Sequence, residues 1–361
     1  MSVVLFATPA FAAERPAYPA EALDRWLGEC VKVYDSPASP RAEYGNFVKL
    51  FTSGNLFASL GLETYARNLH MDEAAQKWAK IGETNGVVAV LRELAASDSR
   101  AQALMGDVYQ LGLAGTAVDY AQALAWHHRA AERGNAYAQA SLGSMYAYVE
   151  AVRDDAKSTA WYRKAAEQGN ASGQFNLGFA YAGGRGIARD NRRAVEWYRK
   201  AAEQGYAAAQ SDLGFMYMSG RGVARDVRQA VEWYRKAAGQ GNARAQAWLG
   251  LMYANGRGVA RDERQAFEWF RQAAELGNAD AQLYLGFAYD EGRVVAKDER
   301  AAVEWWRKAA EQGHAGAQYG LGMRYALGRG VDKDERLAAE WLRKAADQGN
   351  EDAKKALGRL K

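Results

Sequence analysis

The sequence is poor in the residues that build disulfide frameworks and metal centres. Its 361 residues include one cysteine, Cys30, and four histidines. One cysteine excludes an intrachain disulfide framework and a cysteine-rich zinc site, and four histidines leave little material for an imidazole metal centre. Hydrophobic residues make up 49% of the chain, enough for a packed core, which excludes wholesale disorder. We therefore expect a folded protein without a metal or a cofactor.

The chain also lacks an excess of either charge. Lys and Arg number 47 and Asp and Glu number 43, which gives a formal net charge of +4. This charge is small for the length and argues against a specific nucleic-acid partner. After the amino terminus, no stretch approaches the ~20 apolar residues of a membrane-spanning helix. We therefore expect no transmembrane span.

Proline is missing from most of the chain. All five prolines lie within the first 40 residues, and the remainder is rich in Ala, Glu, Arg, Lys, Gln and Leu. Because proline disrupts helices and these residues favour them, the sequence predicts helix throughout residues 41–361. The 37 glycines fit this prediction if most of them lie at helix ends.

Tryptophan and glycine recur with a nearly constant period. Seven tryptophans are separated by 35 residues once and then by 36 residues five times, and a glycine ladder follows the same period. Such self-similarity is typical of repeat architectures. The tryptophans are Trp126, Trp161, Trp197, Trp233, Trp269, Trp305 and Trp341. The period predicts seven units that begin near residues 97, 134, 169, 205, 241, 277 and 313.

Each unit contains the signals for two helices, which we call helix A and helix B. In the fifth unit, Asn242 is placed to cap helix A, and Gly256 to end it. Asp262 is placed to cap helix B, and Gly277 to end that helix. Neither helix can bury its apolar stripe alone, so neighbouring hairpins must stack. We predict an all-α, right-handed αα-solenoid of about seven 36-residue helix-turn-helix repeats.

The packing inside a unit can be anticipated from the fifth repeat. Leu249 and Gly250 lie on the apolar face of helix A, and the missing side chain of Gly250 allows helix B to approach closely. We expect the tryptophan of each unit, here Trp269, to wedge between helix A and helix B and to supply much of the buried surface.

The repeat pattern carries a resemblance to a known family. The pattern A-x-x-x-L-G-x-x-Y-x-x-G-x-G-V-x-x-D-x-x-x-A-x-x-W-Y-R-K-A-A-E-Q-G, over residues 97–361, resembles the Sel-one-like repeat (SLR), a relative of the tetratricopeptide repeat. The resemblance implies a superhelical adaptor that assembles signalling, secretion or envelope complexes. One secreted branch of the family pairs cysteines in every repeat and is linked to penicillin binding. This chain has no repeat cysteines, so that link does not carry over.

The amino terminus resembles the rear part of a secretory signal peptide. Residues 1–13, MSVVLFATPAFAA, contain a short apolar stretch and a small-x-small cleavage pattern, although no basic residue precedes the stretch. We expect a periplasmic or secreted protein, or a cytoplasmic one if this segment is not a signal. Residues 14–96 are expected to form a helical cap with a degenerate repeat, followed by the solenoid at residues 97–361. Cys30 is expected to be buried in a helix of this cap.

Enzymatic motifs are nearly absent. The sequence contains no HExxH, no GxSxG and no phosphate-loop lysine. His127 and His128 are adjacent, so they point about 100° apart on a helix, and we interpret them as drift within the repeat. The Gly-Arg-Gly loops recur as helix ends and not as phosphate cradles. We predict no catalytic, cofactor-binding or metal-binding residues, and no enzyme activity.

Helix A carries the main candidate binding surface. Positions beside the buried Leu-Gly pair hold apolar side chains that vary between units, and in such stacks helix A lines the concave side. A row of this kind suits a peptide or a partner helix, although packing against the neighbouring helix A is an alternative. We expect the position just before each leucine, including Trp248 and Tyr284, to be largely exposed. The candidates are Phe175, Phe215, Trp248, Leu251, Tyr284, Phe287 and Tyr319.

The loops between the two helices offer a second surface. Their basic residues could align along one edge as a ridge for an anionic partner such as lipid headgroups or an acidic polymer. Neutralisation by the adjacent capping aspartates is the alternative. The residues concerned are Arg221, Arg225, Arg257 and Arg261.

We therefore predict a non-catalytic protein–protein interaction scaffold in the bacterial envelope. Two alternatives remain: a protein that binds polyanions or membrane surfaces, and a cell-wall-related enzyme or its regulator.

Overall fold

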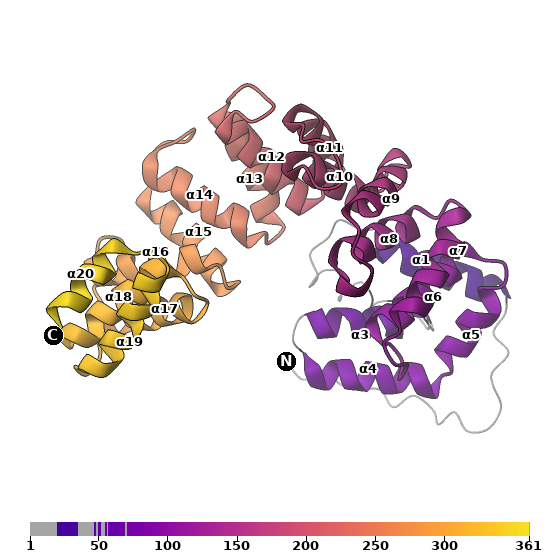
Figure 1. Ribbon diagram of the computed structural model, residues 1–361, viewed down its shortest axis with the longest axis horizontal. Helices are drawn as coiled ribbons and strands as arrows, with labels where there is room; N and C mark the ends of the chain where they lie inside the picture. The colour runs from indigo at the N-terminus through magenta and orange to yellow at the C-terminus, as the bar shows by residue number, and fades with distance from the viewer. Residues whose placement is uncertain are drawn as a thin grey trace. The chain divides into compact units, whose positions relative to one another are not determined.

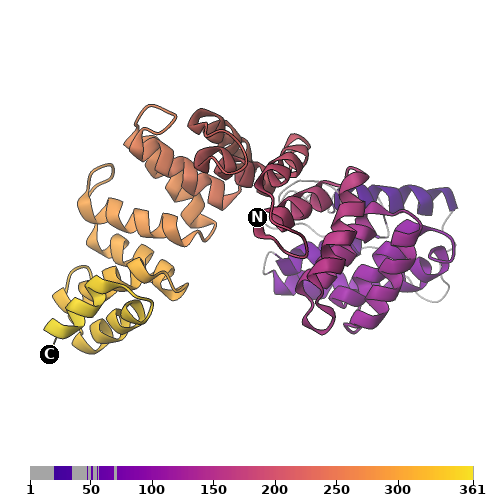
Figure 2. The same ribbon diagram turned by 45° about the horizontal axis from the view of Figure 1, so that its top comes forward.

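The computed structural model describes residues 20–34, 47, 50–51, 55, 57–68 and 71–360. The predicted signal segment, residues 1–13, lies outside the described residues. The regular structure of the described residues is helical, without a β-strand. The chain divides into two compact units, Met1–Tyr206 (unit 1) and Ala207–Lys361 (unit 2). In each unit the helices follow one another in chain order (Figures 1 and 2).

The first helices of unit 1 share a core with the first repeat. They are α1 (Ala20–Tyr34), α3 (Ala58–Asn68), α4 (Asp72–Thr84) and α5 (Val87–Leu94). Leu91 of α5 lies in one apolar cluster with Leu104 and Met105 of α6. Cys30 is buried in α1, as expected, and burial raises the pKa of its thiol well above the usual range. This thiol is therefore protonated and unreactive at neutral pH.

Seven helical hairpins follow, which confirms the predicted αα-solenoid. The A helices are α6 (Ser99–Leu111), α8 (Ala136–Tyr148), α10 (Ala171–Gly183), α12 (Ala207–Ser219), α14 (Ala243–Asn255), α16 (Ala279–Glu291) and α18 (Ala315–Leu327). The B helices are α7 (Tyr120–Glu132), α9 (Asp155–Glu167), α11 (Asn191–Glu203), α13 (Val227–Gly239), α15 (Glu263–Glu275), α17 (Glu299–Glu311) and α19 (Glu335–Asp347). A short 3₁₀ helix, η1 (Glu150–Val152), stands in the second repeat, and α20 (Glu351–Arg359) follows the last hairpin.

The helix ends are formed by the residues that the sequence predicts. Asn242 accepts a hydrogen bond from the backbone N–H of Ala245 at 2.9 Å, and Asp262 accepts from the N–H groups of Arg264 and Gln265 at 3.0 Å. Gly256 ends α14 in the left-handed region with φ 62°, where a side chain would be strained. These caps satisfy backbone groups that the helix itself leaves unpaired.

The tryptophans do not fill the interior of each hairpin, so the predicted wedge role is wrong. Each is half-buried, and the residue after it is buried instead. The buried residues are His127, Tyr162, Tyr198, Tyr234, Phe270, Trp306 and Leu342. They contact the helix A glycine: a Cβ on Gly250 would lie 2.8 Å from the ring of Phe270, which confirms the close approach predicted there.

The tryptophans instead lie between consecutive repeats. Trp269 packs against the apolar cluster that α13 of the preceding hairpin, including Tyr234, forms with α14 of its own hairpin. One residue along a helix corresponds to a rotation of about 100°, which moves the tryptophan from the interior to the edge of its own hairpin. There a lysine three residues later covers the ring, with its Nζ 3.9–4.1 Å from the ring centroid in five repeats.

A chain of buried glutamines also joins successive repeats. Gln282 of α16 donates to the carbonyl of Ala274, in α15 of the preceding repeat, at 3.2 Å. It also accepts at 2.8 Å from Gln312, which ends α17 in its own repeat. Equivalent side-chain pairs join Gln204 to Gln174, Gln240 to Gln210 and Gln348 to Gln318. The pattern places one satisfied polar side chain at the joint between hairpins, where it fixes their register.

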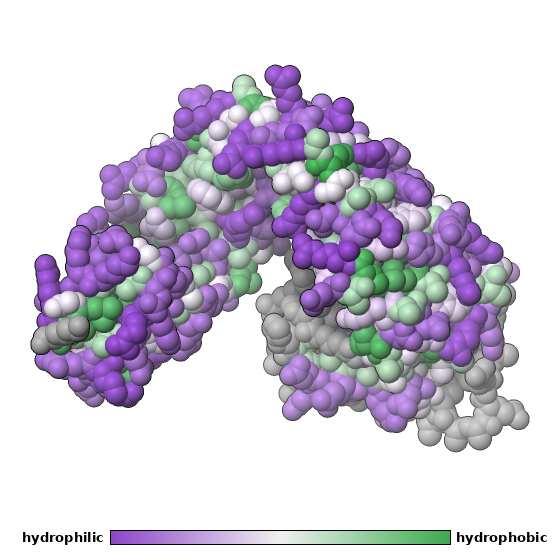
Figure 3. Space-filling view, viewed as in Figure 1, coloured by the Kyte–Doolittle hydropathy of each residue, from purple (hydrophilic) through white to green (hydrophobic). Residues whose placement is uncertain are grey.

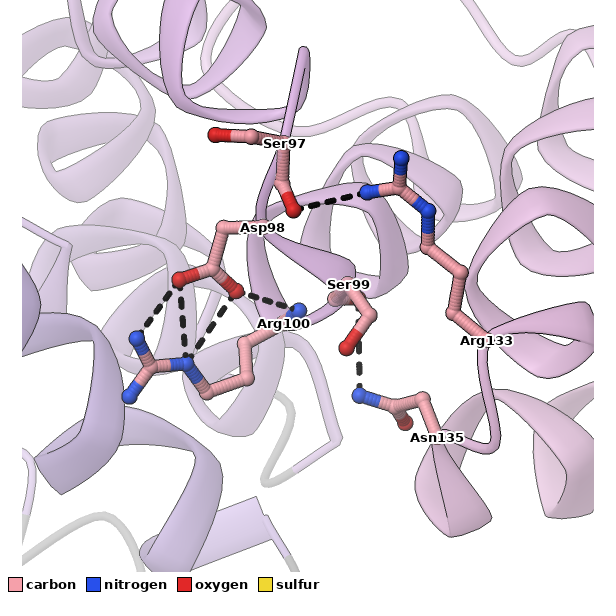
Figure 4. A network of polar contacts seen from close by, with 6 residues as sticks. All are labelled: Ser97, Asp98, Ser99, Arg100, Arg133 and Asn135. Atoms are coloured by element: carbon pink, nitrogen blue, oxygen red, sulfur yellow. Dashed lines mark hydrogen bonds and ion pairs between the residues drawn. The ribbon is translucent and has the colours of Figure 1, made fainter.

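The joint at the start of the first repeat uses different residues (Figure 4). Asp98 caps α6 by accepting from the backbone N–H of Arg100 at 2.7 Å, and it also pairs with the Arg100 guanidinium. Arg133 stands where later repeats have glutamine and donates to the carbonyl of Ser97 at 2.7 Å. Asn135, the cap of α8, reaches the carbonyl of Ser99 at 3.4 Å. The first two hairpins are therefore joined through side chain–backbone hydrogen bonds.

Candidate functional site

Six apolar side chains follow the A helices of unit 2, and we call them the aromatic row. They are Phe215, Trp248, Leu251, Tyr284, Phe287 and Tyr319. The buried leucine and glycine of each A helix face helix B, so the adjacent positions lie at the border of the buried stripe. Tyr284 and Phe287, both in α16, have exposed fractions of 39% and 45%, and the other four are half-buried.

Two members of the aromatic row lie on buried rings of helix B. Tyr284 stacks on Phe270 with ring centroids 4.4 Å apart and an interplanar angle of 7°. Trp248 lies parallel to Tyr234 at 6.1 Å and also contacts Phe215 at 6.3 Å. One face of each ring is therefore fixed by the core, which limits its rotamer freedom before any partner binds.

The position before each leucine is less exposed than the sequence predicts. Tyr284 is exposed, but Asn176, Asp212, Trp248 and Gly320 are half-buried. The reason is the helix B ring beneath this position. Over the large ring of Trp306 stands Gly320, whose added Cβ would already lie 3.6 Å from the indole. The side chain at this position therefore varies with the ring that it covers.

Phe287 and Tyr319 occupy the far end of the aromatic row. Phe287 makes an edge contact with Trp306 at 5.4 Å, and Trp306 is held by its indole N–H, which donates to the carbonyl of Leu283 at 3.2 Å. Tyr319 packs against the apolar cluster around Leu342. This end combines an exposed ring with a rigid support.

Ion pairs between neighbouring A helices border the aromatic row. Asp290 of α16 pairs with Arg324 of α18 at 2.6 Å, and both side chains are largely buried. Asp212 of α12 pairs with Arg244 of α14. Burial raises the pKa of Asp212, and the charge of Arg244 opposes that shift. Charges placed in this way provide a polar border around an apolar surface.

In unit 1 the same helix positions are different. Phe175 is half-buried between Tyr198 and Tyr206, with ring centroids 5.8 and 5.2 Å away. The position after the helix A glycine holds Asp107 and Ser144 in the first two repeats, where unit 2 has apolar residues. Sequence reasoning did not single out Asp107. The available signal was this departure from the repeat pattern.

The basic residues of the inter-helix loops are exposed, but several have local partners. Arg261 pairs with Glu263, the first residue of α15, and Lys297 pairs in the same way with Glu299 at 2.9 Å. Arg225 donates to the carbonyl of Met218 at 3.1 Å, and Arg221 lies over the ring of Phe215 at 5.4 Å. Arg257 is exposed. The compensating charges come from glutamates at the start of helix B, while the capping aspartates accept from backbone N–H groups.

Among the described residues, no group of three or more His, Cys, Asp and Glu side chains is arranged to hold a metal ion. None of the helices in this part of the chain is long and apolar enough to cross a membrane.

Comparisons with known proteins agree with this architecture. A family model for the Sel1 (Sel-one-like) repeat matches seven consecutive segments, residues 99–135, 136–170, 171–206, 207–242, 243–278, 279–314 and 315–350. A Sel1 repeat protein from Oxalobacter formigenes is 31% identical, with a TM-score of 0.63 and 98% of each chain covered. A protective antigen of uropathogenic Escherichia coli with an SLR fold is 38% identical, with a TM-score of 0.62, 88% of this chain and 67% of that chain covered. No curated protein matches the sequence.

Proposed function

This chain belongs to the Sel1 repeat family, and from that premise we propose that it is a non-catalytic scaffold that binds a protein or peptide partner on the aromatic row of unit 2. Sel1 repeat proteins in general act as scaffolds for protein interaction. The specific proposal is that the partner binds to the aromatic row. The observation that supports it is that the core already holds the exposed rings of this row in place.

Rigid, partly exposed aromatic side chains are favourable binding anchors. Aromatic residues are enriched among interface positions that contribute ~2 kcal/mol or more when truncated. Tyr284 loses little rotamer freedom on binding because Phe270 already fixes one face of its ring. Phe287 lies on the same helix, one turn away, and is 45% exposed. These two rings form the centre of the proposed surface.

The surface also indicates the kind of partner. Neighbouring A helices in such stacks lie ~10 Å apart. An α-helical partner places side chains at about this distance every seven residues, and a peptide in the polyproline II conformation does so every third residue. The ion pairs Asp212–Arg244 and Asp290–Arg324 lie beside the row and suit polar side chains at the partner's edges. We propose an amphipathic segment with apolar anchors at one of these spacings.

We propose a location in the bacterial envelope. The signal-like residues 1–13 support this proposal, as does the similarity to a protective antigen of uropathogenic E. coli. The test is expression of the full chain in E. coli, followed by osmotic shock and intact mass measurement. Release of a chain shortened after Ala12 or Ala13 is expected, and retention of the full-length chain in the cytoplasm would contradict the proposal.

We further propose that the helices before α6 shield the first repeat. Their support is the apolar cluster that Val87 and Leu91 form with Leu104. A first hairpin without this cover would expose that cluster to water.

Binding to the aromatic row can be tested with a selected peptide. Peptides displayed on phage are selected on the full chain, and the affinity of the strongest is measured by calorimetry. Tyr284→Ala and Phe287→Ala are each expected to weaken binding about 30-fold, equivalent to ~2 kcal/mol. Phe179→Ala is the matched control, because Phe179 occupies the position of Phe287 in unit 1 and is 38% exposed. Equal losses in all three variants, or no loss in the first two, would place the binding surface elsewhere.

A further inference from the structure

A pocket of about 250 Å³ lies in unit 1 on the A helices of the first three repeats. Its wall combines apolar residues, such as Leu111 and Ala140, with polar ones. The polar residues include Asp107 and Gln110 of α6, Tyr137, Ser141 and Ser144 of α8, and Ser172 of α10. The aromatic row occupies the corresponding helices of unit 2, so this pocket is a separate feature. Its volume suits one small group and not a drug-sized molecule.

Asp107 is the single carboxylate among the described lining residues. Its side chain is nearly inaccessible, with a residue exposure of 5%. Its Oδ2 accepts a hydrogen bond from the hydroxyl of Tyr137 at 2.9 Å, and its Oδ1 lies 3.6 Å from Nε2 of His127, which is fully buried in α7. None of the lining residues that the structure describes is Lys or Arg.

His127 does not neutralise this carboxylate. Burial lowers the pKa of His127 to about 3, so the imidazole is uncharged at neutral pH. Burial also raises the pKa of Asp107 to about 7, and the hydrogen bond from Tyr137 opposes that rise. Above pH 7 the pocket therefore holds a negative charge without a protein cation beside it, which is an unfavourable arrangement for a folded chain alone.

The fold itself does not require this polar pair. The fifth repeat has Leu251 and Phe270 at the positions of Asp107 and His127, and the sixth has Phe287 and Trp306. These hairpins have the same helix lengths and the same close approach at the helix A glycine. Asp107 is therefore a departure from the repeat pattern that the packing of the hairpin does not require, and its side chain lines the pocket.

We propose that this pocket binds a primary ammonium group, which pairs with Asp107 and donates to the hydroxyl and amide oxygens around it. An ammonium is compact and carries three donors, which suits a pocket lined by one carboxylate and by the hydroxyl groups of Ser141 and Ser144. The side-chain oxygen of Gln110, 3.3 Å from Nε2 of His127, lines the same pocket. The ring of Tyr206 also lines the pocket and can add a cation–π contact. A lysine side chain of a peptide and a free diamine supply the same group.

The test measures binding of defined amines to the full chain by calorimetry at pH 8, where Asp107 is ionised. The probes are Nα-acetyl-lysine methylamide, the same compound with an acetylated side chain, and 1,5-diaminopentane. We expect binding of the lysine compound and at least a tenfold loss on acetylation. Tighter binding of the lysine compound than of the diamine identifies a peptide source, and the reverse order identifies a free diamine. Both orders support an ammonium site.

Three variants separate binding from folding. Asp107→Asn keeps an acceptor for Tyr137 but removes the charge, and at least a tenfold loss of affinity is expected. Asp280→Asn is the matched control, because Asp280 also lies on a helix A but is outside the pocket and has His314 as its partner; its affinity should equal that of the parent. The pair Asp107→Leu with His127→Phe copies the fifth repeat, so it should fold and fail to bind. The proposal is overturned if the parent binds neither amine, if the acetylated compound binds equally, or if Asp107→Asn binds as the parent does.

Discussion

The two units use the same positions of helix A for different chemistry. In unit 2 the position after the helix A glycine is apolar, as in Leu251 and Phe287, and the surface is a row of supported rings. In the first two repeats of unit 1 the position holds Asp107 and Ser144, and the surface is a polar pocket. Below these positions the leucine, glycine and glutamine contacts recur from repeat to repeat. The hairpin contacts are therefore shared by both units, while the neighbouring positions differ in chemistry without changing those contacts.

The face of the molecule drawn in Figure 3 does not reveal this difference between the two units. Among the residues coloured in Figure 3, both units present mainly hydrophilic side chains, with hydrophobic ones in small separate spots. Scattered apolar residues are normal on a protein surface and require no partner. The distinction between the units therefore rests on particular helix positions.

The largest expected effect tests whether the residue after each tryptophan is the structural one. Tyr234→Ala removes a fully buried ring and should lower the free energy of unfolding by about 3–5 kcal/mol. Trp233→Ala removes a half-buried ring covered by Lys236 and should cost about half as much. Urea unfolding of unit 2, followed by circular dichroism, measures both. If Trp233→Ala lowered the free energy of unfolding more than Tyr234→Ala, the tryptophan and not the tyrosine would be the interior residue of the hairpin.

The helix ends could be predicted from the sequence, whereas the residue that fills the hairpin interior could not. The helix ends were predictable because Asn242, Gly256 and Asp262 act through local geometry. The interior was not, because Trp233 and Tyr234 recur with the same period and periodicity alone cannot tell which of two adjacent rings faces inward. The exposure of Trp248 depends on the ring of Tyr234 beneath it, which is a contact between different helices.

The pocket beside Asp107 was even harder to predict from the sequence than the interior of the hairpins. Asp107, His127 and Tyr137 come from three different helices and meet only after the hairpins stack. In the sequence, His127 differs from the tyrosine of later repeats by one substitution and suggests drift. Only the burial of the pair in the folded chain shows that the two changes belong together.

The second prediction makes unit 1 resemble unit 2. Replacing Asp107 by Leu and His127 by Phe should raise the free energy of unfolding by about 1–4 kcal/mol, because buried polar pairs are often less stable than apolar residues of similar size. Tyr137 is half-buried, so water can satisfy its hydroxyl in the variant. Thermal and urea unfolding measure the gain. A loss would mean that the pair is a structural requirement of the first hairpin, and that the two units differ in their core and not only in their surface.

The third prediction concerns the pH dependence of the same pair. Between about pH 4 and pH 6.5 the folded chain holds Asp107 protonated and His127 neutral, whereas the unfolded chain holds the opposite pair of forms. Both states then bind one proton at these two groups, so their contributions to the pH dependence cancel. In Asp107→Asn the unfolded chain binds the extra proton of His127. The free energy of unfolding should then fall by up to ~1.4 kcal/mol per pH unit as the pH decreases below 6.5.

The complementary variant should give the opposite slope. In His127→Phe the folded chain alone keeps the proton of Asp107, because burial raises its pKa from 3.8 to about 7. The free energy of unfolding should then fall as the pH rises from about 4 to about 7. Urea unfolding at one-unit intervals between pH 4 and pH 8 measures the slopes. Parallel slopes in the parent and both variants would show that the two groups do not titrate differently on folding.

The smallest effect concerns a defect in the glutamine chain of unit 2. Residue 276 is leucine, whereas the equivalent position in the other repeats of unit 2 is Gln240, Gln312 or Gln348. Leu276 is 56% exposed, and the side-chain oxygen of Gln246, which such a glutamine would contact, is buried without a hydrogen-bond partner. A buried acceptor left in this state costs free energy that one hydrogen bond recovers. Leu276→Gln should therefore stabilise unit 2 by about 1 kcal/mol and remove an exposed apolar side chain.

A control separates the hydrogen bond from the loss of the exposed leucine. Leu276→Met keeps an apolar side chain and is unbranched and about as long as glutamine, but it cannot donate a hydrogen bond, so its unfolding midpoint should match that of the parent. If Leu276→Gln and Leu276→Met unfold at the same urea concentration, the orphaned oxygen of Gln246 costs nothing measurable, and the glutamine chain contributes to the register of the repeats without contributing to their stability. If only the glutamine variant gains, the contact between α14 and the end of α15 in the fifth repeat is the weakest of its kind within unit 2. Local opening should then begin there, which hydrogen exchange of the α14 and α15 amides would show as lower protection in the parent than in Leu276→Gln.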